Sequence, residues 1–174
     1  MVFCIAVCGS GDVSLTESKT VLSQAELVGK YVALRGCVLV TGGRGGVMEA
    51  ACKGAKGQGG TTLGVLPGSR YEANDYVDIP LATMMGEKRN NLLVSIADGI
   101  IVLSGRWGTL NEITNAVIQG KPLVFLQGGG GFVDMLLDAG FQDTIDSPFA
   151  ITMDPEDAVE KAICLASKAN TSKD

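Results

Sequence analysis

The feature that most constrains this sequence is a repeated unit, in which a short apolar run leads through a glycine turn into a helix. Residues 99–103 form an apolar, mostly β-branched run. Gly99 begins the run and Gly105 lies shortly after its end, which is typical of a buried strand. The turn SGRWGT (104–109) follows, and apolar residues then recur at helical spacing from 110 to 117. Similar glycine turns follow the apolar runs 2–7 and 37–40. This pattern predicts an α/β protein.

Strand-like and helix-like segments alternate along the whole chain. We expect strands over 2–7, 37–40, 62–66, 77–83, 99–103, 122–126 and 149–152, and helices over 14–34, 47–56, from Glu87, 110–117, 132–139 and from Pro155. Such alternation predicts a three-layer, doubly wound (Rossmann-like) parallel sheet with helices on both faces. Ligands bind to such sheets at the carboxyl ends of the strands, near the point where strand order reverses.

Length and composition indicate one domain with a sizeable core. The chain has 174 residues, 46% of them hydrophobic, and 24 glycines. We expect a single domain over 1–169 and a frayed tail over 170–174. A net charge of −5 without a basic cluster argues against nucleic-acid binding. No run is long enough to cross a membrane and no charged leader precedes residues 2–7, so we expect a cytoplasmic protein.

The cysteines and the absence of histidine limit the chemistry. Five scattered cysteines (Cys4, Cys8, Cys37, Cys52 and Cys164) favour buried free thiols and show no zinc-site spacing, so no metal site is expected. A chain without histidine has no histidine-based triad and no imidazole ligand for a metal. Acid–base chemistry must come from carboxylates, lysine, tyrosine or cysteine.

Three glycine turns converge at the expected carboxyl edge of the sheet. The first amides of a helix and the positive end of its dipole bind anions, most often phosphate, and glycine lets the ligand approach the backbone. The candidate phosphate-binding residues are Gly9, Ser10, Gly42, Gly43, Arg44, Gly45, Gly46, Gly105, Arg106, Gly108 and Thr109.

Standard nucleotide motifs are missing from these turns. A serine replaces the third glycine of the dinucleotide fingerprint in the first turn, and no acidic residue follows the second strand to hold a ribose. No P-loop sequence occurs either. Several roles stay open: Arg44 can be a solvated loop charge, Trp107 can stack on a ligand or cover the core, and Glu112 can face the ligand or stabilise the helix dipole.

The residues after the central strand resemble a known family motif. The sequence SGRWGTLNE (104–112) is similar to the PGGxGTxxE motif of the LOG ("lonely guy") cytokinin-activating phosphoribohydrolases, once labelled possible lysine decarboxylases. Ser104 replaces the proline and Arg106 the second glycine. The stretch 40–67 more closely resembles the molybdenum cofactor carrier proteins. Together these resemblances extend over 7–126.

The LOG resemblance implies hydrolysis of the N-glycosidic bond in a nucleoside 5'-monophosphate, giving the base and ribose 5-phosphate. It also implies that Glu112 and Arg89 are catalytic and that hydrolysis requires no cofactor. The family usually has Arg-Lys where this chain has Arg89-Asn90, so the second cation is Lys88, out of register. On physical grounds, a carboxylate can stabilise the developing oxocarbenium ion and activate water.

The carrier resemblance implies binding without catalysis. The same glycine turns would hold the molybdenum cofactor, and Arg44 and Arg106 would neutralise its negative charge. Lysine decarboxylation is rejected, because nothing in the sequence supports pyridoxal phosphate chemistry. Both resemblances imply a small-molecule ligand and a homodimer that pairs through its helices.

Overall fold

One parallel sheet organises the computed structural model, which describes residues 2–11 and 18–171. Within these residues the strands lie in the order β4-β3-β2-β1-β5-β6-β7. Their bounds are β1 Cys4–Cys8, β2 Val38–Thr41, β3 Thr62–Leu66, β4 Ile79–Ala82, β5 Gly99–Leu103, β6 Leu123–Leu126 and β7 Phe149–Thr152.

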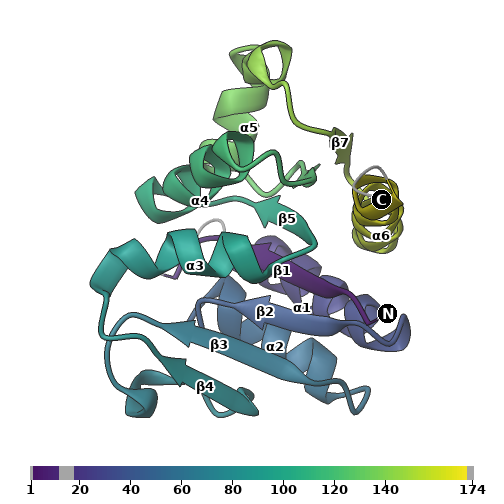
Figure 1. The fold of residues 1–174 in the computed structure, drawn as a ribbon. Coiled ribbons are helices and arrows are strands. Elements are labelled where there is room, and N and C mark those ends of the chain that lie inside the picture. Colours follow the sequence, from purple (N-terminus) through teal and green to yellow (C-terminus); the bar gives the residue numbers. More distant parts are fainter. Residues whose placement is uncertain (1, 12–17, 172–174) are drawn as a thin grey trace.

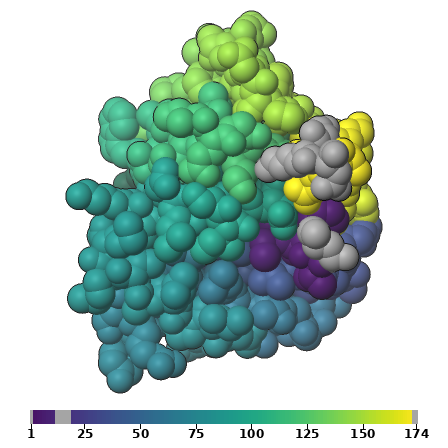
Figure 2. All heavy atoms as spheres, in the orientation of Figure 1, coloured from purple at the N-terminus to yellow at the C-terminus, as the bar shows by residue number. Residues whose placement is uncertain are grey.

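Helices cover both faces of this sheet (Figure 1). The helices α1 (Ser18–Leu34), α2 (Val47–Lys56) and α6 (Pro155–Thr171) pack on one face, and α3 (Arg89–Ile96), α4 (Trp107–Ile118) and α5 (Gly131–Asp138) on the other. Short 3-10 helices are η1 (Arg70–Glu72), η2 (Gly86–Lys88) and η3 (Phe141–Thr144). In the space-filling view, the teal and green atoms of α3, α4 and α5 cover much of the near face (Figure 2). No helix of the described residues is apolar over a length that would cross a membrane.

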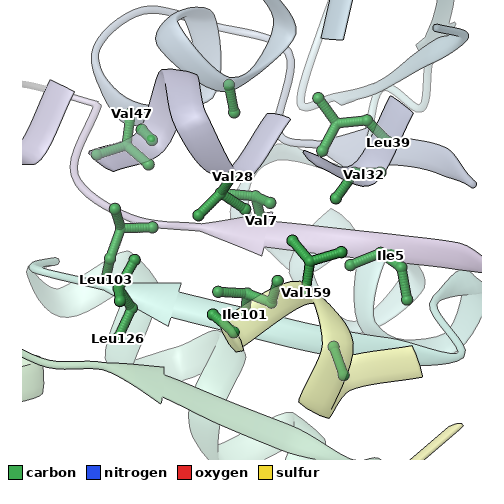
Figure 3. Packing of buried hydrophobic residues seen from close by; sticks show 14 of the residues in the cluster. Ile5, Val7, Val28, Val32, Leu39, Val47, Ile101, Leu103, Leu126 and Val159 are labelled. Atoms are coloured by element: carbon green, nitrogen blue, oxygen red, sulfur yellow. The ribbon is translucent and has the colours of Figure 1, made fainter. Parts of the chain in front are cut away.

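The core has two halves because neighbouring side chains of a strand point to opposite faces. On β1, Ile5 and Val7 pack towards α1, α2 and α6 (Figure 3). Ala6 and Cys8 of the same strand pack towards α3, α4 and α5. The central strands are therefore buried on both sides, which accounts for their continuous apolar sequences.

The strand order reverses between β1 and β5. The chain runs outward from β1 to β4, returns to place β5 beside β1, and then continues outward to β7. Residue Cys8 pairs with Val102 in the parallel register, so both strands end at the same edge. The loops that follow β1 and β5 therefore face one crevice, where open α/β sheets bind ligands.

The expected three-layer α/β fold is confirmed, with local differences at element ends. The expected start of the first helix at Ser14 lies outside the described residues. The final helix continues through Asn170 and Thr171, which we had expected in the tail. Its predicted cap is confirmed, because the amide of Asp157 donates to Oδ1 of Asp154 at 2.8 Å.

The crossing of α1 and α2 leads to a stability prediction. A Cβ on Gly54 would lie 1.9 Å from the carbonyl oxygen of Glu26, so Gly54→Ala forces the helices apart. We expect a loss of about 1–3 kcal/mol, measured by denaturant unfolding. The control is Gly57→Ala, where the residue is right-handed and the nearest atom would lie at 3.5 Å, so stability should hold or rise. Equal loss in both variants would contradict the close packing.

Candidate ligand-binding site

A cavity of about 930 Å³ opens at the carboxyl edge of the sheet, where the strand order reverses. Its wall consists of residues 9–11 after β1, Arg44, Gly45 and Met48 at the start of α2, residues 87–91 at the start of α3, and residues 106–109, 111, 112 and 115 on α4. This volume is in the range that holds a small organic ligand.

Most of the sequence-predicted site residues meet in this wall. Those that line it are Gly9, Ser10, Arg44, Gly45, Arg89, Arg106, Gly108, Thr109 and Glu112. The other predicted residues, Gly42, Gly43, Gly46 and Gly105, lie behind the wall. The predicted site residues come from distant parts of the sequence, and the strand order brings them together at the carboxyl edge of the sheet.

The glycines behind the wall allow the loops to pack against one another. Gly46 has a φ of +67°, and a Cβ there would lie 2.4 Å from the carbonyl oxygen of Ser10. Gly105 has a φ of +95°, and a Cβ there would lie within 2.7 Å of the Thr109 side chain. Gly43 packs against β3. These glycines therefore shape the site without lining it.

A buried ion pair joins α3 to α4 inside the wall. Nη1 of Arg89 lies 3.3 Å from Oε1 of Glu112, and these residues are only 4% and 6% exposed. Gly42 lies against the guanidinium, because a Cβ on it would be 2.7 Å from Nη2 of Arg89. Glu112 is in the second turn of α4, so the helix-dipole role left open above is not the one it has.

Burial controls the ionisation of the carboxyl. It raises the pKa of Glu112 to about 7, although the nearby Arg89 acts in the opposite direction. Burial also raises the pKa of the Cys8 thiol, and the neighbouring Glu112 raises it further. Cys8 is therefore a poor nucleophile, whereas Glu112 can exchange a proton near neutral pH.

The helix α4 presents its N-terminus to the cavity. Its N-cap residue, Arg106, makes no side-chain capping hydrogen bond, which leaves the amides of the first turn for an anion. The N-terminus of α5 differs, because the amides of Phe132 and Val133 donate to the carbonyl oxygens of Gly105 and Ser104 at 3.0 and 2.9 Å. The α5 amides thus hold the β5–α4 loop in place.

The two residues that differ from the family motif, Ser104 and Arg106, can be related to the local structure. Ser104 has a φ of +52°. Proline holds φ near −65°, so the proline of the motif does not fit this conformation. Arg106 is exposed and adds a positive charge at the cavity wall.

The described part of the cavity wall has a net charge opposite in sign to the net charge of the whole chain. Among the described residues, the wall contains four basic residues, Arg44, Lys88, Arg89 and Arg106, and two acidic ones, Glu87 and Glu112, in a protein whose net charge is −5. This described part of the wall thus has an excess of positive charge, which favours an anionic ligand.

A row of amide side chains is a part of the site that sequence reasoning missed. Nδ2 of Asn90 donates to Oδ1 of Asn111 at 3.1 Å, and Nδ2 of Asn91 donates to Oδ1 of Asn115 at the same distance. All four residues line the cavity. Their spacing was a usable signal, since Asn111 and Asn115 are one turn apart and Asn90 and Asn91 follow Arg89.

Comparisons with known proteins place the chain in a family. The profile of the SLOG cluster4 family matches residues 2–159. The chain belongs to this family. An uncharacterised protein of Archaeoglobus fulgidus is 44% identical over 100 residues, which are 58% of this chain and 66% of that protein. A Mycobacterium tuberculosis protein named cytokinin riboside 5'-monophosphate phosphoribohydrolase is 33% identical over 69% of this chain and 73% of its own length.

Solved structures resemble the chain over nearly its whole length. A molybdenum cofactor binding protein of Rippkaea orientalis matches with a TM-score of 0.82 and 34% identity over 98% of each chain. The molybdenum cofactor carrier protein of Chlamydomonas reinhardtii matches with a TM-score of 0.84 and 32% identity over 96% of this chain and 99% of that one. The family profile, the M. tuberculosis relative and these structures together confirm the LOG-like superfamily resemblance. The relative supports the hydrolase hypothesis and the structures support the carrier hypothesis.

The raised pKa of Glu112 leads to a test of the buried ion pair. Because the folded-state pKa is about 7 and the ordinary value 4.5, the folded protein binds more protons between these values. The carboxyl should therefore lower the free energy of unfolding as pH rises from about 4.5 to 7. In Glu112→Gln, which cannot ionise, this pH-dependent loss should disappear. The measurement is denaturant unfolding of both proteins across this range, and parallel curves would contradict the burial effect.

Proposed function

We propose that the cavity binds a phosphate-bearing, nucleotide-like ligand and that the protein hydrolyses the N-glycosidic bond of a nucleoside 5'-monophosphate. The observation that carries this proposal is Glu112, a buried carboxyl with a pKa of about 7 that is paired with Arg89 inside a basic cavity. A group that exchanges protons near neutral pH suits general acid–base catalysis.

The N-terminus of α4 is the proposed phosphate site. Amides of Gly108 and Thr109 would donate to the phosphate oxygens, and Arg106 beside them would supply positive charge. The Nε of Arg89 is buried and has no hydrogen-bond partner among the described residues, which is unusual for a buried donor and fits a site that a bound group or water completes. A phosphate held in this way would fix the sugar in front of Glu112.

Hydrolysis then needs one water molecule. Ionised Glu112 accepts a proton from the water as its oxygen forms a bond to C1' of the ribose. The bond between C1' and the base nitrogen breaks and its electron pair stays on the base. The base takes up one proton from solvent, and Glu112 releases to solvent the proton that it took from the water, so one water is consumed in all. The negative carboxylate also stabilises the positive charge that develops on the sugar. The products are the free base and ribose 5-phosphate.

The relatives support this proposal and a second candidate. The M. tuberculosis relative bears the name of a cytokinin riboside 5'-monophosphate phosphoribohydrolase. The second candidate is a molybdenum cofactor carrier, and the observation that favours it is the similarity to cofactor-binding proteins over nearly the whole chain. The volume and the basic wall also suit a phosphate-bearing pterin.

The first test is hydrolysis of AMP and related nucleoside monophosphates, followed as free base and ribose 5-phosphate. Glu112→Gln should lower kcat about a hundredfold or more while AMP still binds, because it removes the proton acceptor and preserves the shape. With the wild type, kcat should rise with pH through about 7 as the carboxyl ionises. The matched control is Glu49→Gln, an exposed carboxyl on α2 outside the wall. Binding of AMP or molybdopterin without product release would favour the carrier.

The second test concerns the phosphate site. A Cβ on Gly108 meets no atom within 4 Å, so Gly108→Val should fold normally while its side chain crowds the first-turn amides. Affinity for AMP and for ribose 5-phosphate should fall at least tenfold by calorimetry. Unchanged affinity with unchanged melting temperature would mean that the phosphate binds elsewhere.

A further inference from the structure

We propose that the indole ring of Trp107 is the platform on which the planar ring of the ligand stacks. This inference rests on the proposed function, since it assumes a ligand with a phosphate group and an aromatic ring. It assigns the ring-binding part of the site, whereas the groups discussed above concern the phosphate and the glycosidic bond.

The exposure of Trp107 excludes a role in the core. The residue is 75% exposed and belongs to neither hydrophobic cluster. It nevertheless lines the cavity as the first residue of α4. A large aromatic side chain at the wall of a ligand-sized cavity, with most of its surface uncovered, is suited to bind a flat apolar partner.

A second aromatic ring holds the indole in place. The ring centroids of Trp107 and Phe132 lie 4.9 Å apart with an interplanar angle of 62°, an edge-to-face contact. The main chain of Phe132 is tied to the β5–α4 loop that precedes Trp107, because its amide donates to the carbonyl oxygen of Gly105 at 3.0 Å. The indole is therefore oriented before a ligand arrives, which lowers the entropy lost on binding.

The platform and the proposed phosphate site are adjacent. The indole of Trp107 and the amide of Gly108 belong to consecutive residues, so one ligand of nucleotide size can contact both. Stacking requires a flat ring but does not read its hydrogen-bonding edge. Trp107 should therefore favour ligands with large flat rings, such as purines or pterins, over pyrimidines, without selecting one purine over another.

The experiment compares two ligands that differ only in the ring. AMP carries the adenine and ribose 5-phosphate lacks it. In Trp107→Ala, calorimetry should show about a ten- to hundredfold loss of affinity for AMP, the usual effect of removing a stacking aromatic side chain. Affinity for ribose 5-phosphate should change less than threefold. Trp107→Phe should restore most of the AMP affinity.

Fluorescence gives an independent measurement. Trp107 is the only tryptophan of the chain, so quenching by AMP reports on this ring alone, and ribose 5-phosphate should quench little. Tyr71→Ala is the matched control, because Tyr71 is 91% exposed on η1 and lies outside the cavity wall. That variant should bind both ligands as the wild type does.

Several results would overturn the inference. Equal loss of both ligands in Trp107→Ala, or loss of neither, would exclude stacking. A Trp107→Ala protein that loses its self-association in sedimentation, with AMP affinity unchanged, would assign the ring to a contact between copies. AMP that binds without being hydrolysed contradicts only the proposed reaction, and the affinity ratios then still decide the platform. A wild type that binds neither ligand would overturn both.

Discussion

The buried pair of Arg89 and Glu112 is the interaction on which the candidate site depends. Burying either charge alone is costly, so each residue lowers the cost of burying the other in its charged form. The guanidinium approaches Gly42 so closely that no other residue fits there without movement. Thus the loop after β2, the start of α3 and the second turn of α4 constrain one another through one contact. The sheet order makes this contact possible by returning the chain to β5 beside β1.

Around this pair, some backbone amides at helix N-termini donate to the protein itself, and others are left for a ligand. The first-turn amides of α5 are used to hold the β5–α4 loop, and the amide of Val47 at the start of α2 donates to the carbonyl oxygen of Ser10 at 3.0 Å. The N-terminus of α4 is different, since it lines the cavity and its N-cap residue, Arg106, makes no side-chain capping hydrogen bond. The dipole of α4, with the basic residues around it, is therefore directed at the cavity.

Much of the fold could be predicted because its information is local. Apolar runs, glycine turns and helical spacing lie within short windows, and they predicted the layers and the edge at which the loops converge. The ends of elements were less certain. The last helix runs to Thr171 although its final residues are polar, because nothing in the sequence after Ala169 breaks a helix.

The candidate site could be predicted only in part. A glycine pattern does not tell whether the missing Cβ makes room for a ligand or for neighbouring backbone, and so Gly46 and Gly105 were grouped with residues that line the cavity. Arg89 and Glu112 were singled out only by a family resemblance, and their pairing was not predicted, because no spacing in the sequence brings these residues together. The asparagines were missed because an asparagine on a predicted helix usually faces solvent, whereas Asn90 is buried here against α4.

Hydrolase and carrier share nearly every feature of this cavity, and Glu112 is the feature that separates them. Backbone amides and arginines serve either function, since both require an anion to be held. A carboxyl in the wall is needed for hydrolysis but not for binding alone. A site that only binds an anion has no need of a carboxyl, whose negative charge is offset here by Arg89, whereas a site that must activate water requires a proton acceptor. Because burial brings the pKa of Glu112 to about 7, the carboxyl gains this capacity at a pH where a free glutamate would be a much weaker base. This capacity, together with its place in the cavity wall beside Arg89, is why we base the proposed hydrolysis on Glu112.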